Sequence, residues 1–378
     1  MPNSNSSAPA PQGRLATLLA LLDRDQSNVA MLTDTIECAL AQNRPDIARE
    51  LFERLAALSA PGPREDNLRG LIALQSGEFE DAAAIYTALL EANPQDSAVR
   101  YNLAWARAQL GDWEAPLSLL DESSANALPQ AATLRVQALH QRGDLEQALS
   151  EATAYVIQHP RYAPLFAAAS VVAVDAEDLP LATSYAQSAG AHPDALTTLA
   201  TVALAEGRTD DANALFGQVL EAAPDAPRAL IGVGLGKMLA GSYAPAAADI
   251  ERGAAIFGDH LGSWVAAGWA YLFAGDLGEA RRCFDTSLAL DHNFAETHGS
   301  LAVLHLIEGR AEESRRAAQT AMRLNPQCFS GTLAQAMLQS SKGRTDQARA
   351  ILDRALHTPL DASGRTIAQS LARHGLSL

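Results

Sequence analysis

The sequence contains few aromatic, cysteine and basic residues. Phe, Trp and Tyr make up 5% of its 378 residues, and the only cysteines are Cys38, Cys283 and Cys328. Three cysteines cannot form a disulfide framework in so long a chain, and their scarcity is typical of a reducing compartment. Lys and Arg number 28 against 44 Asp and Glu, a formal charge of −16. This deficit argues against a general nucleic-acid or anionic-membrane binder, which needs a dense basic surface.

Long apolar runs are also missing. The early run from Leu15 to Leu22 is shorter than the roughly 18–20 residues that span a bilayer, and no small-residue cleavage site follows it. We therefore expect a cytoplasmic chain without a signal peptide or direct membrane insertion. Residues 1–12 are rich in Ser, Asn, Pro and Ala, which predicts a disordered tail before a first helix that begins near Gly13.

What the sequence does contain is an internal repeat of about 34 residues. Its most regular mark is a glycine, replaced in two units by Asn43 and Glu177. The ten marks are Asn43, Gly77, Gly111, Gly143, Glu177, Gly207, Gly241, Gly275, Gly309 and Gly343, and their successive differences are 34, 34, 32, 34, 30, 34, 34, 34 and 34. A period in this range indicates a stack of short structural units.

Small residues recur at two fixed places in each unit. Alanine stands five residues after the mark in eight of the ten units, and Gly or Ala usually stands seven residues before it. A bulky residue such as Tyr86 often follows four residues after the alanine, and prolines such as Pro94 close several units. Because Pro cannot continue a helix and Gly accepts a left-handed turn, each unit is predicted to be two helices joined by a tight turn.

This pattern resembles the tetratricopeptide repeat family. The fullest match consists of Trp264, Gly268, Tyr271, Gly275, Ala280 and Phe284. The resemblance covers about residues 29–360 and implies an all-α solenoid, a right-handed superhelix of about ten helix-turn-helix repeats. Two departures are Glu177 for Gly in repeat five and Pro116 for Ala in repeat three, where the proline should disturb the start of the second helix.

The repeats divide the chain into five predicted segments. These are a disordered tail (1–12), an N-terminal cap helix (13–28), repeats one to five (29–190), repeats six to ten (191–360) and a C-terminal cap helix (361–378). The 30-residue spacing between repeats five and six arises from a Gly/Pro turn at residues 188–194. It predicts either a hinge or only a variation in loop length, which costs little.

No motif in the sequence points to catalysis, a cofactor or a metal. The glycine-rich stretch 232–237 lacks both the following Ser or Thr and the preceding strand of a phosphate-binding loop. His292, His298 and His305 do not follow the three- or four-residue spacing of helical metal ligands, and we interpret them as packing residues. Because the repeats occupy nearly the whole chain, we expect a protein that is not an enzyme.

Groove positions remain as candidate partner-binding residues. The resemblance implies that positions 5 and 9 of the first helix of each repeat point into a concave groove. At these positions repeats seven to nine carry Ile231, Leu235, Val265, Trp269 and Val303, and repeat three carries Tyr101 and Trp105. A contiguous exposed apolar stripe usually marks a partner site, and aromatic residues are favoured anchors. The alternative is that neighbouring helices already bury these side chains.

These observations predict a non-catalytic scaffold or adaptor that binds a partner polypeptide, as a helix or an extended segment, in its groove. Assembly or chaperone-like work in a bacterial machinery would suit such a protein. A self-assembling homo-oligomer and a regulatory subunit of an enzyme complex are the alternatives. Residues 1–280 hold 16 basic and 35 acidic residues, a net charge of −19. This charge favours a partner with a basic segment, or it serves solubility alone.

Overall fold

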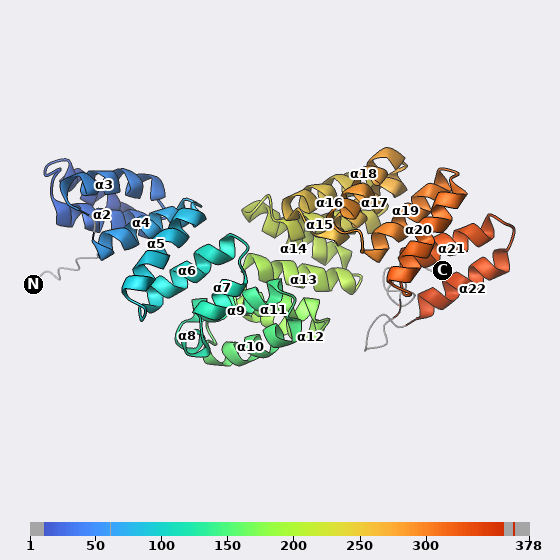
Figure 1. Cartoon of the computed structure of the whole chain (residues 1–378), viewed down its shortest axis with the longest axis horizontal. Coiled ribbons are helices and arrows are strands. Elements are labelled where there is room, and N and C mark those ends of the chain that lie inside the picture. Colours follow the sequence, from blue (N-terminus) through green and yellow to red (C-terminus); the bar gives the residue numbers. More distant parts are fainter. Residues whose placement is uncertain (1–10, 61, 359–365, 367–378) are drawn as a thin grey trace, which may run out of the picture. The chain divides into compact units, whose positions relative to one another are not determined.

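A computed structural model describes residues 11–60, 62–358 and 366 (Figure 1). These residues form 22 α-helices and no β-strand. The prediction of an all-α solenoid built from paired helices is confirmed.

Ten helix pairs follow one another along the chain, in the order in which the repeats were predicted. They are α2 (Val29–Ala41) with α3 (Pro45–Leu58), α4 (Pro63–Gln75) with α5 (Phe79–Ala92), α6 (Ser97–Gln109) with α7 (Glu114–Leu119) and the extra α8 (Glu122–Ala127), α9 (Pro129–Gln141) with α10 (Leu145–Gln158), α11 (Ala163–Asp175) with α12 (Leu179–Ala189), α13 (Pro193–Ala205) with α14 (Thr209–Ala222), α15 (Pro227–Leu239) with α16 (Tyr243–Phe257), α17 (Leu261–Ala274) with α18 (Leu277–Leu290), α19 (Ala295–Ile307) with α20 (Ala311–Leu324), and α21 (Phe329–Ser340) with α22 (Thr345–His357).

The turn inside each pair has the same backbone conformation. All ten predicted marks have a positive φ, between 75° and 85° at the eight glycines, 53° at Asn43 and 61° at Glu177. At the second repeat the Gly77 N–H donates to the Leu74 carbonyl at 3.2 Å, and the next N–H donates back to the Ala73 carbonyl at 2.9 Å. These bonds satisfy carbonyls that the end of the helix would leave without partners. The predicted left-handed turn is therefore confirmed.

Small residues let the two helices of a pair approach closely. A Cβ atom placed on Gly268 would lie 2.3 Å from Cε1 of Phe284, and one on Gly70 would lie 2.7 Å from Cζ of Tyr86. Both aromatic side chains are fully buried. The small residue of the first helix therefore leaves the space that the bulky side chain of the second helix fills.

Repeat three departs from this plan where the sequence places Pro116. Its second helix, α7, is only six residues long and is followed by the short α8. A guanidinium N–H of Arg135 donates to the Leu120 carbonyl between these two helices, at 2.5 Å. The same side chain forms two hydrogen bonds with Glu151, at 3.0 and 2.8 Å. The predicted disturbance of the helix start amounts to one residue, since α7 begins three residues after Gly111 and the second helices of the other repeats begin two residues after their marks. The interruption after Leu119 was not predicted, and an arginine from the next repeat supports it.

The first helix, α1 (Pro11–Leu22), precedes the repeats and begins two residues before the predicted start at Gly13. Its Leu15 and Leu22 side chains are buried in the hydrophobic cluster that α2 and α3 form. Because a repeat cannot bury its own apolar face, α1 covers the face that no preceding repeat covers.

The chain divides into two compact units, residues 1–172 and 173–378. The dividing point lies within α11, ahead of the predicted irregularity at residues 188–194. There, α12 is 11 residues long and is followed by Gly190, whose φ is 65°. A short helix and a short turn thus account for the 30-residue spacing, and the hinge stays a prediction.

Two of the predicted segments lie wholly or largely beyond the described residues. These are the tail at residues 1–12, of which residues 1–10 are outside, and the C-terminal cap helix at residues 361–378, of which only Thr366 is described. Within the described part of the chain, no helix has both the length and the apolar character needed to cross a bilayer.

Candidate protein-interaction surface

The first helices of repeats seven to nine carry almost no charge. α17 has no charged residue, α15 has Arg228 and Lys237, and α19 has Glu296. The two basic side chains pair with Asp175 and Asp249, at 3.7 and 2.5 Å. The carboxylate of Glu296 accepts two backbone N–H bonds from the start of α21, at 2.9 and 3.2 Å. The charges of these helices are therefore satisfied within the chain.

The predicted apolar stripe on these helices is wrong for two of its five members. Val265 is 8% exposed and Val303 is 2% exposed. Both belong to the hydrophobic core that joins repeats eight, nine and ten, together with buried residues of α19 and α21. Neighbouring helices cover these valines, which was the alternative interpretation of the sequence.

The other three members, Ile231, Leu235 and Trp269, are partly exposed. Ile231 and Leu235 pack at the edge of the core cluster of α16 and α17. The indole N–H of Trp269 donates to the Ser300 hydroxyl at 2.9 Å, and its ring meets that of Phe284 edge-on, with centroids 6.3 Å apart. Trp269 is thus held in place by the next repeat while part of its ring remains accessible.

A row of more exposed side chains begins beside Trp269. Leu239, Phe273 and Ile307 are 38%, 52% and 47% exposed, and each stands at or next to the end of the first helix of its repeat. Tyr243, at the start of α16, is 37% exposed and lies 5.4 Å from Phe273 between ring centroids. We name Leu239, Tyr243, Phe273 and Ile307 the turn-side row.

Sequence reasoning missed the turn-side row, although a signal was present. Leu239, Phe273 and Ile307 are spaced by 34 residues, whereas the same position holds Ala205 in repeat six and Ser341 in repeat ten. The family resemblance led us to predict binding residues only at positions 5 and 9. The structure shows that large apolar side chains are more accessible four residues beyond position 9.

The second predicted spot, Tyr101 and Trp105 in repeat three, is half-buried. Both rings pack against the core cluster that includes Leu120 and Leu134. Burial raises the pKa of the Tyr101 hydroxyl to about 12. These rings lie in the unit formed by residues 1–172, whereas repeats seven to nine belong to the unit formed by residues 173–378. The partial burial of Tyr101 and Trp105 indicates that they contribute to the packing of the core.

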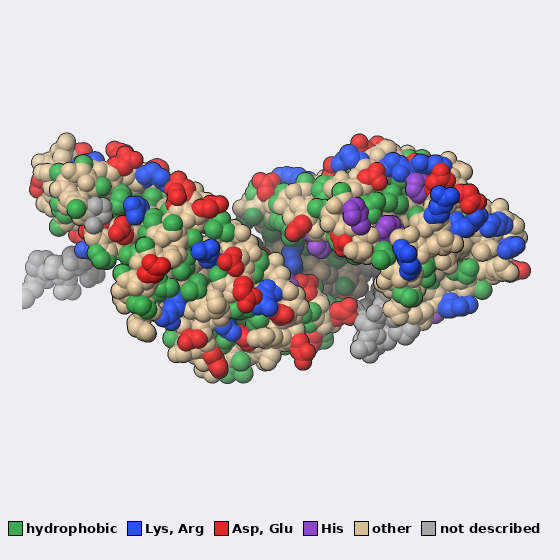
Figure 2. All heavy atoms as spheres, in the orientation of Figure 1, with side chains coloured by type: hydrophobic (Ala, Val, Ile, Leu, Met, Phe, Trp, Pro, Cys, Tyr) green, Lys and Arg blue, Asp and Glu red, His purple; other side chains and the backbone are tan. Residues whose placement is uncertain are grey.

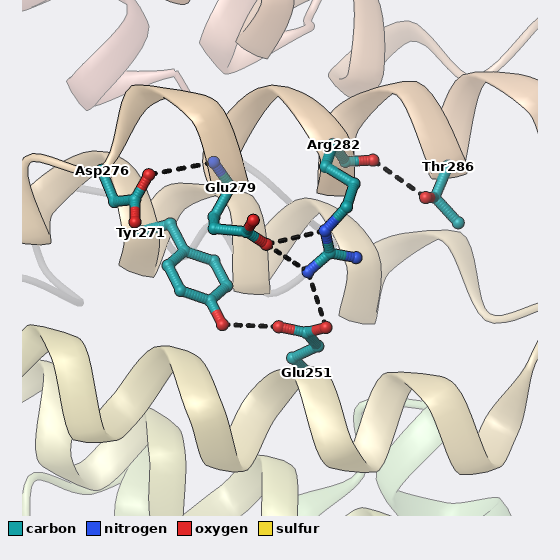
Figure 3. A network of polar contacts seen from close by, with 6 residues as sticks. All are labelled: Glu251, Tyr271, Asp276, Glu279, Arg282 and Thr286. Atoms are coloured by element: carbon teal, nitrogen blue, oxygen red, sulfur yellow. Dashed lines mark hydrogen bonds and ion pairs between the residues drawn. The ribbon is translucent and has the colours of Figure 1, made fainter.

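A network of polar contacts fixes α16, α17 and α18 against one another (Figure 3). One oxygen of Glu251 accepts from the Tyr271 hydroxyl at 2.5 Å, and the other accepts from the Arg282 guanidinium at 2.6 Å. Arg282 also donates to Glu279 at 2.7 Å. Burial and the bond to Glu251 raise the pKa of Tyr271, so the hydroxyl remains a donor. The network supports the frame that carries Trp269 and Phe273.

Among the residues that the structure describes, the histidines and cysteines do not assemble into a metal site. No group of three His, Cys, Asp or Glu side chains suited to a metal ion occurs in the described part of the chain. A ring nitrogen of His298 lies 2.8 Å from the backbone carbonyl of His292, and burial together with Arg310 lowers the pKa of His305. Burial raises the pKa of the Cys283 thiol to about 12. A protonated, buried thiol is a poor nucleophile and a poor metal ligand.

A cavity of about 260 Å³ lies among α20, α21 and α22. It is lined by apolar side chains such as Phe329 and Ile351, with Arg354 and Thr332 beside them.

Charge is unevenly distributed over the unit formed by residues 173–378. Residues 173–280 hold 4 Lys and Arg against 14 Asp and Glu, a net charge of −10. Basic side chains instead gather over α20 to α22, as Figure 2 shows. We call this excess of acidic residues over residues 173–280 the acidic field. Repeats seven to nine, residues 227–324, hold 9 Lys and Arg against 11 Asp and Glu.

Comparison with known families agrees with this architecture. Residues 156–374 match the model described as the cilia and flagella-associated protein 70 C-terminal domain. Residues 73–135 and 129–152 match two models of the tetratricopeptide repeat. No curated protein matches the chain.

Two solved structures of similar fold are 14% and 11% identical to this chain in sequence. The Cut9–Hcn1 hetero-tetramer of the APC/C is similar with a TM-score of 0.64 and 14% identity, over 92% of this chain and 67% of that one. Human IFIT1, solved as a dimer with m7Gppp-AAAA, is similar with a TM-score of 0.55 and 11% identity, over 94% and 97% of the two chains. At such identities the likeness shows the fold alone. The family match at residues 156–374, in contrast, spans more than half of the sequence, and the chain therefore belongs to the tetratricopeptide-repeat proteins, in the family described as the cilia and flagella-associated protein 70 C-terminal domain.

Proposed function

We propose that this chain is a non-catalytic scaffold that binds a partner polypeptide on the first helices of repeats seven to nine. The observation that supports the proposal most directly is the partly exposed apolar surface of Ile231, Leu235 and Trp269. It lies on helices whose charged residues are already paired within the chain. Exposed apolar surface of this kind is retained in proteins chiefly where a partner covers it.

A docking role also agrees with the large share of the chain that forms repeats. The repeats occupy almost all of residues 29–357, and in repeat arrays the extended surface between units is what binds ligands. We include in the proposal that the chain works as a cytoplasmic adaptor or chaperone-like assembly factor. The machinery it serves, expected from the sequence to be bacterial, would be identified by the captured partner.

The acidic field favours a partner with a basic segment. Charge complementarity raises association rates, and salt screens it over about 10 Å at 0.1 M ionic strength. With the partner in hand, the association rate should fall clearly between low and physiological ionic strength. An association rate that does not change over this range would indicate that the acidic residues serve solubility alone, and the basic segment would be removed from the proposal.

Affinity capture with the full chain, read by mass spectrometry, tests the proposal. The variant carrying Leu235→Ala and Trp269→Ala should lose the partner that the unaltered chain captures. A variant with Ile157→Ala, which removes a 71% exposed side chain from another repeat, should keep it. Circular dichroism must show that both variants retain their helices. Equal capture by the double variant and the control would refute the site.

Self-assembly is the second candidate, because the partly exposed surface of Ile231, Leu235 and Trp269 would also suit a second copy of the chain. Size-exclusion chromatography with light scattering distinguishes the two functions. A stable oligomer that dissociates on Leu235→Ala with Trp269→Ala would favour the self-assembling scaffold. A monomer that captures a different protein favours the adaptor.

A further inference from the structure

We propose that the joint between repeats eight and nine loosens in acid when His305 takes up a proton, and that this loosening weakens partner binding at Trp269. The joint is the packing of α17 and α18 against α19. His305 lies in the last turn of α19, and its side chain is 17% exposed. Its Nδ1 atom is buried and has no hydrogen-bond partner among the residues that the structure describes. The effect on binding rests on the proposed function, whereas the loosening is measured on the chain alone.

The carboxylate nearest to His305 is already occupied. Oε2 of Glu308, the residue that ends α19, lies 3.8 Å from the Nδ1 atom of His305. The same oxygen pairs with the guanidinium groups of Arg281, from α18, and Arg310, which precedes α20. Burial acts to raise the pKa of Glu308, but the hydrogen bonds from Arg310 and Arg281 outweigh it and the pKa is lowered. The carboxylate therefore stays ionised in mild acid, and two cations already share it.

A proton on His305 would add a third cation to this cluster. Two guanidinium groups and one carboxylate leave one positive charge in excess, and a protonated ring would make the excess two. Glu313 in the first turn of α20 favours the proton, as does the carbonyl end of α19. Burial, Arg310 and Arg281 together outweigh them, so the pKa of His305 is lowered. The closed joint therefore holds the ring in its neutral form.

The same position in the two preceding repeats carries side chains that bond to a carboxylate. Lys237 and Tyr271 stand 68 and 34 residues before His305. The Lys237 ammonium pairs with Asp249, and the Tyr271 hydroxyl donates to Glu251, each at 2.5 Å. Nδ1 of His305 makes no such bond within the described part of the chain. Repeat nine thus places a side chain that changes charge near neutral pH where its proton would meet no free carboxylate.

The direction of the pH effect follows from the linkage between protonation and stability. Above the ordinary pKa of histidine, about 6.5, the ring is neutral in the closed and in the open joint, and the joint has its full stability. As the pH falls from that value toward the lowered pKa of the closed joint, only the open joint takes up the proton. Acid therefore shifts the equilibrium toward the open joint.

The joint also keeps Trp269 in place. The Trp269 indole N–H, from α17, donates to the hydroxyl of Ser300 in α19 at 2.9 Å. Opening of the joint separates these two helices and breaks this bond. A side chain that is disordered before binding loses more conformational entropy when a partner orders it. The affinity for a partner that contacts Trp269 should therefore fall in acid together with the stability of the joint.

Amide hydrogen exchange of the full chain at about pH 7.5 and about pH 5.5, corrected for the intrinsic pH dependence of exchange, tests the loosening. Protection of α18 and α19 should fall at least about threefold more than that of α13 and α14, since one unit of pKa difference changes the opening equilibrium about tenfold. His305→Gln should abolish this local loss, because glutamine is neutral at both pH values. His298→Gln, which removes a partly exposed ring from the same helix, is the matched control and should keep the loss.

Arg281→Gln distinguishes the effect of charge from a packing role of the ring. It removes one cation from the cluster and leaves Arg310 paired with Glu308. The pKa of His305 should then return toward its ordinary value, and the loss of protection in acid should shrink. The ring signals of an isotope-labelled chain, assigned by means of His305→Gln, report this pKa directly by NMR.

Three results would overturn the loosening: no local loss of protection in the unaltered chain, an equal loss in His305→Gln, or a His305 ring that titrates at or above the ordinary histidine pKa. Partner affinity that falls in acid for the unaltered chain but not for His305→Gln supports the effect on binding. Equal affinity at both pH values in the unaltered chain overturns it. Capture at neutral pH that depends on Leu235 and Trp269 upholds the proposed function in either case.

Discussion

Replacing Gly268 by alanine should destabilise repeat eight, although alanine is the better helix former. Gly268 lies within α17, where the exchange of Gly for Ala gains about 1 kcal/mol of helix propensity. The new Cβ, however, would lie 2.3 Å from Cε1 of Phe284 and 2.5 Å from its Cδ1. Phe284 is 0% exposed and cannot move away without displacing its own neighbours. Overpacking of this kind costs about 1–3 kcal/mol.

Gly217 provides the matched control. It lies inside α14 of the same unit, and a Cβ placed there would meet nothing within 4 Å. Gly217→Ala should therefore gain about 1 kcal/mol, while Gly268→Ala should range from neutral to a loss of about 2 kcal/mol. Since the propensity gain is common to both, the difference between the variants is the packing strain itself.

Amide hydrogen exchange followed by mass spectrometry suits this comparison, because repeat arrays open locally and need not unfold in one step. Protection should fall in α17 and α18 for Gly268→Ala and rise in α14 for Gly217→Ala. A tenfold change in the opening equilibrium corresponds to about 1.4 kcal/mol. Equal gains in protection for both variants would show that Phe284 does not pack against Gly268. A second change, Phe284→Leu, should recover part of the loss in the Gly268→Ala background.

Glu177→Gly should stabilise repeat five by about 0.5–1 kcal/mol. The left-handed backbone at φ 61° costs an L-residue about 1–2 kcal/mol, and the larger conformational entropy that glycine loses on folding offsets only part of this gain. Asn43→Gly should gain less, since Asn tolerates this conformation, and thermal melting compares the two. Arg135→Met should destabilise by about 3–5 kcal/mol, because it leaves the carboxylate of Glu151, 18% exposed, without its partner. Burial raises the pKa of Glu151, but the hydrogen bonds from Arg135 and Gln147 outweigh it and the pKa is lowered. The stability from this pair is therefore complete above the ordinary carboxyl pKa and is lost as pH falls through the lowered one, so urea unfolding should show a smaller difference between Arg135→Met and the unaltered chain in acid.

The sequence by itself determined the repeat, the turns and the pairing of small with large residues. The ten marks predicted from spacing are ten residues of positive φ, including Asn43 and Glu177, where no glycine is present. This succeeded because a left-handed turn is a local requirement, and it recurs at the same place in every unit. The delayed start of α7 was equally readable, since Pro116 acts on the first turn of its own helix, whereas the early end after Leu119 was not predicted.

Only the tertiary structure decided which apolar side chains remain accessible. Val265 and Val303 share position 5 or 9 with the partly exposed Ile231 and Trp269, yet they are buried. Phe273 and Ile307, which the family pattern did not single out, are about half exposed. The local sequence does not predict this difference in exposure, because exposure depends on how far the helices of adjacent repeats extend over each position. That coverage is set by side chains 30 or more residues away, such as Ser300, which binds the indole of Trp269.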